Sequence, residues 1–441
     1  MSIKDPNSEN FKSGGNTSTA SDYVTPEKDI GDSPTEDDGM PDFGKAPDGG
    51  IVAWLVAAGA GCLFFAALGF SNSFGVFQEY YMTHQLQDES ADKIAWIGSV
   101  SAFLQFGTGA VAGPLFDRYG ARVIRPAAIA YVSGIMMMSL CSKYWQLMLT
   151  QGLLMGVSMG LLTLPAMASV SQFFDKKRAA ALGIAVSGSS IGGIVFPILL
   201  AKMLHGSSLG FGWSVRLTGF IIVPFMLFAC ATIRARLPAR TTTFFIGRAW
   251  KEPRFTFLVA STFCMFLGMF TPLFFVPTYA VSRGMDATLA SYLLAIVNGA
   301  STFGRVIPGI LADKYGRMNI FALAGLLTGL ITLCMTNAES TAGLIVYCIF
   351  IGFSSGTIIS GCSAAFTGCS RDPREIGTYI GMGMAVGAIA VLIGPPINGA
   401  LVAKYGGYLQ MTIFSGVMCL TGGFIALASK LTTPEGITGR V

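Results

Sequence analysis

A charged turn that occurs twice in an otherwise apolar chain is the feature that most constrains how this sequence folds. The stretch GPLFDRYGAR at residues 113–122 recurs as GILADKYGR at residues 309–317, and each copy follows an apolar run of helix length. A turn of one design in each half of the chain predicts an internal duplication with two similar halves. Both copies share the order acid, base, glycine, base: Asp117, Arg118, Gly120 and Arg122 in the first, and Asp313, Lys314, Gly316 and Arg317 in the second.

Apolar runs make up most of the remaining sequence. Of the 441 residues, 52% are hydrophobic and only 12% are charged, whereas a soluble domain has about 25% charged residues. A transmembrane helix needs about 20 apolar residues. We therefore predict an all-α membrane protein whose twelve transmembrane helices form two pseudo-symmetric six-helix bundles, over residues 48–233 and 255–430. The predicted spans are residues 51–72, 93–116, 123–141, 145–170, 179–203, 213–233, 255–280, 288–312, 318–337, 341–369, 375–402 and 408–429.

The two ends of the chain differ from the spans in composition. Residues 1–47 contain ten acidic residues against four lysines, with Ser, Thr, Gly and Pro between them and too few apolar residues to form a core. Such a segment is expected to be disordered, and it lacks the apolar region of a secretory signal peptide. We predict a disordered acidic cytosolic tail over residues 1–47 and a short cytosolic tail over residues 431–441, and we expect the first span to act as an uncleaved signal anchor.

Basic residues in the short loops indicate on which side of the membrane each loop lies. Alternate loops contain 16 Lys and Arg residues, whereas the loops on the opposite side contain six. The positive-inside rule makes the basic loops cytosolic, so with twelve spans both termini are predicted to be cytosolic, and residues 234–254 form a basic cytosolic linker. Because the positive charge follows membrane topology, it does not indicate binding to nucleic acid. The expected surroundings are a lipid bilayer, and we predict the plasma membrane.

Several classes of function find no support in the residues. The nine cysteines and two histidines do not have metal-ligand spacing, and no GxxxxGK[ST] phosphate loop occurs. No constellation of His, Asp and Ser repeats within the spans, so we expect no metal, no cofactor and no enzymatic activity. No obligate protein partner is evident. Two classes stay open, a secondary transporter with its site near the midplane between the halves and a membrane sensor that binds a metabolite without moving it.

The charged turns resemble the signature loops of the major facilitator superfamily, which follow helices 2 and 8. Two further segments are similar to its monocarboxylate porter family: DGG at residues 48–50 followed by AW at 53–54, and SQFFDKKRAAALGIAVSGSSIGGIVFP at residues 171–197. The resemblance covers residues 48 to about 430, and the chain looks most like fungal members. It implies the fold of that superfamily and a secondary transporter that moves a small organic molecule by alternating access.

The fungal members of the family that this chain resembles include importers of small nutrients and exporters encoded beside secondary-metabolite pathways. We expect efflux of a small organic metabolite, such as a fungal secondary metabolite. The alternatives are a nutrient importer, for monocarboxylate or vitamin uptake, and a sensor of transporter ancestry that does not transport.

The two charged turns are candidates for a gate. Asp117 lies about one helical turn from Arg122, and its carboxylate can accept hydrogen bonds from that arginine or from a neighbouring helix end. Such a contact can hold the two halves together in one state and release them in another. The alternative is that the charges only anchor the loops in the cytosol. The candidate gating residues are Asp117, Arg118, Arg122, Asp313, Lys314 and Arg317.

Arg305 is the most informative residue within a span. It precedes the second charged turn in helix 8, where an unpaired buried charge costs several kcal/mol. A guanidinium can bind a carboxylate through two parallel hydrogen bonds. In monocarboxylate porters an arginine at this place contacts the substrate carboxylate, so the resemblance implies a substrate contact for Arg305. The alternative is that Arg305 extends toward the interface or pairs with Asp313 or Asp117.

Departures from the porter family argue against proton coupling to a small acid such as lactate. Proton-linked animal members have an acid one turn before this arginine, where this chain has Ser301, and a lysine in helix 1, where it has Ser71, Asn72 and Ser73. A larger, partly apolar substrate that is recognised by hydrogen bonds and carries a carboxylate fits better.

Amide side chains within the spans are further candidates for substrate contacts. Each can instead form a hydrogen bond between helices, worth about 0.6 kcal/mol. With Arg305, the candidate substrate-binding residues are Asn72 in helix 1, Gln105 in helix 2, Asn298 in helix 8 and Asn398 in helix 11.

Overall fold

The structure is a computed structural model, and it describes residues 46–238, 245–370 and 372–432. All of these residues belong to one compact unit, Phe43–Val441. Within these ranges the regular secondary structure is helical, with no β-strand. The tail predicted over residues 1–47 lies outside the described residues except for residues 46 and 47, and the predicted tail 431–441 lies outside them except for residues 431 and 432.

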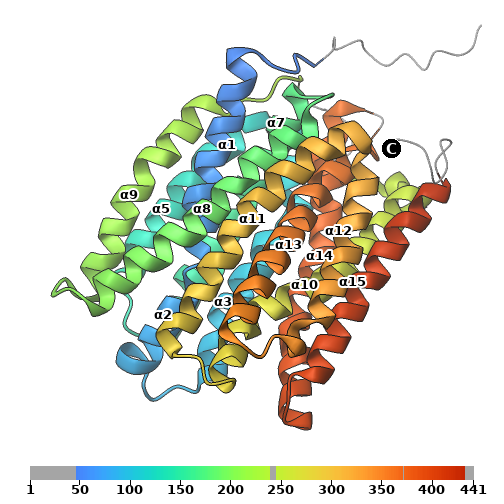
Figure 1. The fold of residues 1–441 in the computed structure, drawn as a ribbon. Coiled ribbons are helices and arrows are strands. Elements are labelled where there is room, and N and C mark those ends of the chain that lie inside the picture. Colours follow the sequence, from blue (N-terminus) through green and yellow to red (C-terminus); the bar gives the residue numbers. More distant parts are fainter. Residues whose placement is uncertain (1–45, 239–244, 371, 433–441) are drawn as a thin grey trace, which may run out of the picture. The chain divides into compact units, whose positions relative to one another are not determined.

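The first half of the chain contains the helices of the predicted spans 1 to 6 (Figure 1). Polar breaks divide some spans into two or three consecutive helices. The bounds are α1 Gly50–Ser71, α2 Phe74–Tyr80, η1 Tyr81–Gln85, α3 Ala91–Gly107, α4 Gly109–Tyr119, η2 Gly120–Val123, α5 Ile124–Met138, α6 Tyr144–Leu147, η3 Met148–Leu154, α7 Met155–Phe173, α8 Arg178–His205 and α9 Gly210–Thr232.

The second half contains the helices of spans 7 to 12, most of them as single long helices. The bounds are η4 Gly247–Lys251, α10 Pro253–Ser282, α11 Ala287–Tyr315, α12 Arg317–Leu333, η5 Met335–Asn337, α13 Thr341–Thr367, η6 Pro373–Glu375, α14 Ile376–Tyr405, α15 Leu409–Ser429 and η7 Lys430–Thr432.

Eleven segments of the described residues are long and apolar enough to cross a membrane. One of them, Lys93–Met138, is 46 residues long and includes α4 and α5 as well as most of α3. Between α4 and α5 the chain reverses at Gly120, whose φ of 63° is a conformation that glycine adopts without strain. This segment therefore contains two crossings. The prediction of an all-α protein with twelve membrane helices is confirmed.

The first span is longer than predicted. It was expected to end at residue 72, but the helical segment continues to Gln85. The polar residues around Asn72 interrupt the apolar run, so hydropathy indicates an end at residue 72 although the helical segment continues. The continuation is held by Tyr81, a fully buried residue whose hydroxyl donates to the Gln151 Oε1 at 2.8 Å. Tyr81 and Gln151 lie in the π-helical turns η1 and η3.

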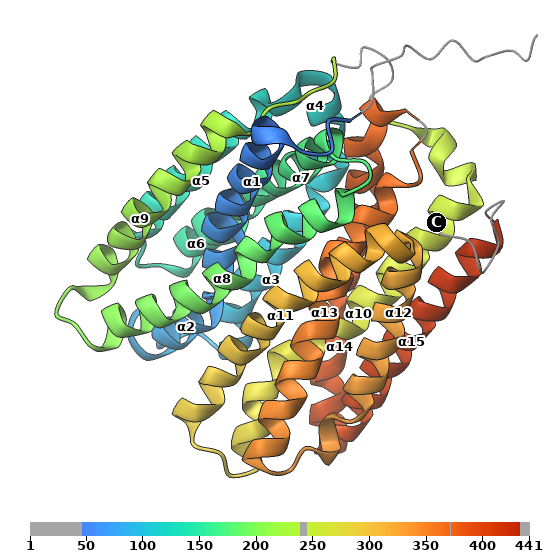
Figure 2. The same cartoon turned by 45° about the horizontal axis from the view of Figure 1, so that its top comes forward.

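The helices pack as two groups. In the first, α8 and α9 pack against α1, and α3 and α5 pack against α7. In the second, α10 and α12 pack against α15, and α11 packs against α13. The groups meet where α4 packs against α14 and where α8 packs against α11 (Figures 1 and 2). Membrane helix 2, which contains α4, thus packs against membrane helix 11, which contains α14. Membrane helix 5 (α8) packs against membrane helix 8 (α11) in the same way, as expected for two pseudo-symmetric halves. The exact bundle boundaries at residues 48–233 and 255–430 stay a prediction.

Candidate functional site

Asp117, in the first charged turn, joins the two halves. It is the third-last residue of α4 and is 5% exposed. Its carboxylate accepts hydrogen bonds from the backbone N–H groups of Gly377 at 3.1 Å and Thr378 at 2.7 Å, and from the Thr378 hydroxyl at 2.6 Å. Both N–H groups belong to the first turn of α14, where they have no partner within the helix and the helix dipole attracts negative charge. We call this contact the first latch.

The first latch depends on glycines that let α4 and α14 approach closely. A Cβ added at Gly113 would lie 2.1 Å from the Gly377 carbonyl oxygen, and one added at Gly377 would lie 2.4 Å from the Asp117 Oδ1. Further along the same pair, a Cβ at Gly381 would lie 2.1 Å from the Gly109 carbonyl oxygen. Small residues at such crossings allow backbone-to-backbone packing in membrane proteins.

Asp313, in the second charged turn, makes the pseudo-equivalent contact. Its carboxylate accepts hydrogen bonds from the N–H groups of Ala179 at 3.0 Å and Ala180 at 2.8 Å, in the first turn of α8. Arg317 also donates to it from Nε at 3.4 Å. A Cβ added at Gly309 would lie 2.7 Å from the Ala179 carbonyl oxygen, so this crossing is close as well. We call this contact the second latch.

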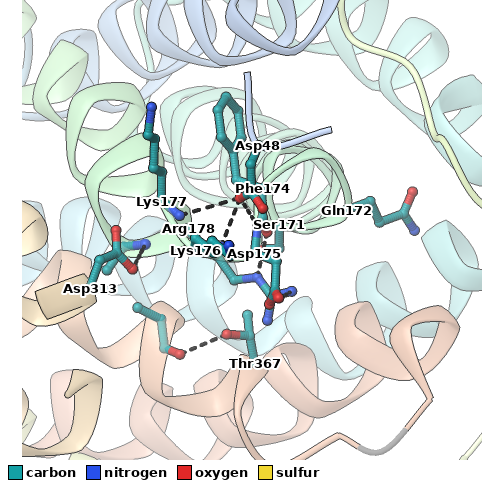
Figure 3. Close-up of polar contacts among 12 residues, drawn as sticks. Asp48, Ser171, Gln172, Phe174, Asp175, Lys176, Lys177, Arg178, Asp313 and Thr367 are labelled. Atoms are coloured by element: carbon teal, nitrogen blue, oxygen red, sulfur yellow. Dashed lines mark hydrogen bonds and ion pairs between the residues drawn. The ribbon is translucent and has the colours of Figure 1, made fainter. Parts of the chain in front are cut away.

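The loop that leads into α8 is held by Asp48, as Figure 3 shows. The Asp48 Oδ1 accepts hydrogen bonds from the N–H groups of Asp175 at 2.6 Å and Lys176 at 2.7 Å, with Lys177 at 3.4 Å. Arg317 also donates from Nη2 to the backbone oxygen of Asp175. Asp48, at the start of helix 1, and Arg317, after helix 8, therefore both bind the loop that leads into α8. The DGG motif carries part of the family resemblance, but Asp48 has no predicted role, because the N–H groups that it binds lie 127 to 129 residues away in the chain.

The basic residues of the charged turns are more exposed than the acids. Arg118 and Lys314 are exposed, and they lie over the rings of Tyr119 at 5.8 Å and Tyr315 at 5.2 Å. Arg122 is exposed and makes no hydrogen bond or ion pair within the described ranges. Of the two partners foreseen for Asp117, the structure therefore contains the neighbouring helix end. We refer to the side of the bundle that carries residues 117–122 and 313–317 as the charged-turn face.

Arg305 lies between the two halves, on α11 where it packs against α8. It is 5% exposed, and its Nη1 donates to the Val186 carbonyl oxygen at 2.8 Å and to the Ser189 hydroxyl. Its Nε is buried and has no hydrogen-bond partner in the described part of the chain. A Cβ on Gly183 would lie 2.1 Å from the Arg305 carbonyl oxygen, so the two helices touch here. Neither of the acids considered in the sequence analysis pairs with this arginine.

Two of the predicted amides, Asn72 at the end of α1 and Asn298 on α11, contact the same helix as Arg305, α8. Asn72 donates from Nδ2 to the Ser189 carbonyl oxygen at 3.4 Å, and Asn298 donates from Nδ2 to the Gly193 carbonyl oxygen at 3.3 Å. A Cβ on Gly193 would lie within 3.1 Å of both amide groups. Arg305, Asn72 and Asn298 therefore converge on one stretch of α8.

The other two amides lie elsewhere. Gln105, on α3, is 7% exposed, and its side chain makes no hydrogen bond to the residues that the structure describes. Asn398 is fully buried: it donates to the Gly394 carbonyl oxygen at 2.9 Å and accepts from the Ser415 hydroxyl at 3.3 Å. Asn398 thus links α14 to α15 within the second group of helices.

The linker before α10 is tied to the start of α14. Arg248 donates from Nη2 to the Glu375 Oε2 at 2.7 Å, and Glu375 is 7% exposed. This hydrogen bond raises the pKa of Arg248. The Tyr379 hydroxyl donates to the Glu252 Oε1 at 3.3 Å. The start of α14 that Asp117 holds is thus also tied to the linker, through Glu375 and Glu252, two acids without a predicted role.

Comparison with known proteins gives the family. The family model described as Major Facilitator Superfamily matches residues 59–395 and, in a second match, residues 309–439. The aspyridones efflux protein apdF of Emericella nidulans is 50% identical over 396 residues, which are 90% of this chain and 81% of that protein. The agnestins efflux protein AgnL12 of Paecilomyces divaricatus is 40% identical over 393 residues, 87% of this chain and 89% of that protein.

Solved structures show the same fold at low sequence identity. The human organic anion transporter MFSD10 gives a TM-score of 0.68 at 16% identity, over 85% of this chain and 98% of that one. The fucose:proton symporter FucP of E. coli gives a TM-score of 0.68 at 16% identity, over 86% of this chain and 99% of that one. With twelve membrane helices, and with relatives far above 30% identity that it matches over most of their length, this chain belongs to the major facilitator superfamily of multi-pass membrane transporters.

Proposed function

We propose that the protein exports an acidic organic metabolite across the plasma membrane, with its charged-turn face and both termini in the cytosol. The direction is supported by relatives that are named as efflux proteins for aspyridones and agnestins. The orientation is supported by the excess of Lys and Arg on the charged-turn side. Within the superfamily we place the chain in the monocarboxylate porter branch, on the segments at residues 48–54 and 171–197.

The observation that carries an alternating-access mechanism is the pair of latches. Asp117 holds the first turn of α14 and Asp313 holds the first turn of α8, so both contacts cross between the halves on one side of the membrane. Breaking both would let the halves part on that side. Charge-assisted hydrogen bonds of this kind are strong but short-ranged, which suits a contact that forms fully in one state and is lost in the other.

Arg305 is the residue that we propose binds the acidic group of the substrate. In the present state its guanidinium is bound to α8 through Val186 and Ser189. When α8 and α11 separate, these bonds are lost and the buried charge needs another partner. A substrate carboxylate supplies one, with Asn72 and Asn298 as neighbouring donors and Gln105 as a further contact. The serine at position 301 in place of an acid favours a larger substrate over a small proton-coupled acid.

Paired metabolomics tests the function and the site together. In the cells that produce the protein, deletion should raise one acidic metabolite inside and lower it in the medium. Arg305→Ala should reproduce the deletion with normal surface expression, because truncating a buried charge contact costs about 2–5 kcal/mol, or more than tenfold in affinity. Arg305→Lys should be intermediate, since lysine lacks the planar fork.

Arg283→Ala is the matched control. Arg283 is an exposed arginine just after α10, paired with Glu339, and its loss should leave export unchanged. A neutral exported compound, or normal export by Arg305→Ala, would refute the role of Arg305. Loss of uptake in place of loss of export would make the protein an importer.

A further inference from the structure

A basic pocket lies on the charged-turn face beside the first latch. Its volume is about 420 Å³, which is within the range of small-molecule sites. Its walls come from the α4–α5 turn, from residues 233–238 after α9, and from Arg374 in the turn η6 that precedes α14. The charged and polar residues of these walls include Arg118, Arg122, Arg125, Arg234, Arg374 and Gln172.

Four of the five arginines have no anionic partner among the residues that the structure describes. Arg374 pairs with Asp372, with Nη2 to Oδ2 at 2.7 Å. The others make no ion pair or hydrogen bond within the residues that the structure describes: Arg118, Arg122, Arg125 and Arg234. Among the described residues of the pocket wall, the only acid is Asp117, and its carboxylate already accepts three hydrogen bonds from the start of α14.

Topology alone does not account for this cluster. Positive-inside charge explains why arginines lie on this face, but three of those outside the pocket pair with carboxylates: Arg178 with Asp175 at 3.2 Å, Arg248 with Glu375 at 2.7 Å, and Arg317 with Asp313 at 3.4 Å. Four unpaired guanidinium groups around one hollow repel one another unless an anion with several oxygens enters. Guanidinium groups bind phosphate oxygens through paired, directional hydrogen bonds.

We propose that this pocket binds a multiply phosphorylated anion and that the bound anion stabilises the closed first latch. The chemistry is shared by a phosphoinositide headgroup and a soluble inositol polyphosphate. The pocket walls come from both halves, because α4 and α5 belong to the first half and Arg374 to the second. A ligand that needs both walls binds the closed state better than the open one and shifts the equilibrium toward it. This coupling rests on the proposed alternating access, whereas binding itself does not.

Binding is tested on the purified full-length protein. The soluble probe is inositol hexakisphosphate, and the lipid probe is phosphatidylinositol bisphosphate in nanodiscs, with phosphatidylserine nanodiscs as the reference. Arg125→Gln combined with Arg234→Gln should weaken binding of the active probe by about tenfold or more. Lys176→Gln combined with Lys177→Gln removes the same charge from the same face outside the pocket, and should change affinity by less than about twofold.

The binding measurements decide whether the site exists and which of the two anions occupies it. Saturable binding of the soluble probe, of the phosphoinositide, or of both supports the site and identifies the source of the anion. Equal affinity in wild type and the Arg125/Arg234 variant, no binding of either probe, or equal binding to phosphatidylserine would overturn it.

The coupling has its own readout, which does not depend on transport. The ligand should slow hydrogen exchange of the Gly377 and Thr378 amides in wild type and not in the Arg125/Arg234 variant. Binding without this protection would overturn the stabilisation of the latch, and it would leave the proposed export untouched.

Discussion

The two latches use one sequence motif but are supported differently. Asp117 is 5% exposed and holds α14 through three hydrogen bonds, one of them from the Thr378 hydroxyl. Asp313 is less buried and accepts only backbone N–H groups from α8, but the loop before α8 is also held by Asp48 and Arg317. The first latch therefore concentrates its strength in one carboxylate, while the second distributes it over a network. Duplicated sequence does not imply equal sensitivity to mutation.

Asp117→Asn should have the largest effect among the changes that follow. The amide keeps one acceptor oxygen but places an NH₂ group against donors, so buried N–H groups at the start of α14 lose their partner, at about 1–3 kcal/mol for each unsatisfied group. We expect export to fall by more than about tenfold while surface expression is retained. Export assays normalised to surface protein measure this. Unchanged export would reduce the first charged turn to a topology anchor.

Gly113→Ala should have the next largest effect. The added methyl group would lie 2.1 Å from the Gly377 carbonyl oxygen, and overpacking of this kind costs about 1–3 kcal/mol. Gly107→Ala, on the same span, is the matched control, since its nearest neighbour would be the Ala388 Cβ at 3.7 Å. Hydrogen exchange at the start of α14 should accelerate in the first variant only. Equal exchange in both would mean that the close approach does not support the latch.

Asp313→Asn should be milder than Asp117→Asn, because Asp48 and Arg317 still hold the loop before α8. We expect export to fall by about threefold, equivalent to roughly 0.7 kcal/mol. Adding Asp48→Asn should bring the loss close to that of Asp117→Asn, and a double-mutant cycle on export rates measures the coupling. Additive effects of the two changes, or a single Asp313→Asn loss as large as that of Asp117→Asn, would contradict the network.

Thr378→Val should have the smallest effect, and it tests the difference between the two latches most directly. It removes the hydroxyl bond to Asp117 and leaves the backbone bonds, so the first latch comes to resemble the second, where Ala180 occupies the corresponding helix turn. One hydrogen bond to a charged group contributes about 1.5–3 kcal/mol at most. Its contribution to the latch is smaller, because water reaches the carboxylate and the hydroxyl when the latch opens. Opening rates from single-molecule distance measurements should rise a few-fold. No change would show that the hydroxyl does not contribute.

Much of the fold was predictable from the sequence because length and apolarity define a membrane helix. The spans agree with the structure to within a few residues, except after Ser71, where a polar break in helix 1 does not end the helical segment. The acids of the charged turns were found because they repeat. For Asp117 a neighbouring helix end was one of the two predicted partners, but which helix it would be was not predictable, since a backbone N–H at a helix start carries no side-chain signature.

Other parts of the site depend on contacts that a single sequence does not reveal. Arg305 was recognisable as a charge within a span, but its bonds to Val186 and Ser189 need α8 and α11 to be brought together. Its role in substrate binding stays a prediction. The contacts of Asp48 were not predictable for the same reason, because its three N–H partners lie 127 to 129 residues further along the chain.

The sequence separation of the latches has a consequence for biosynthesis. The second latch joins residues 133 and 134 positions apart, and the first joins residues 260 and 261 positions apart. Chains are made from the N-terminus, and contacts between distant segments wait for the later one. Asp313 finds α8 already inserted when it leaves the ribosome, whereas Asp117 stays without its helix end until α14 arrives. A nascent chain stalled before α14 would therefore expose the first charged turn to chaperones and proteases after the second had closed.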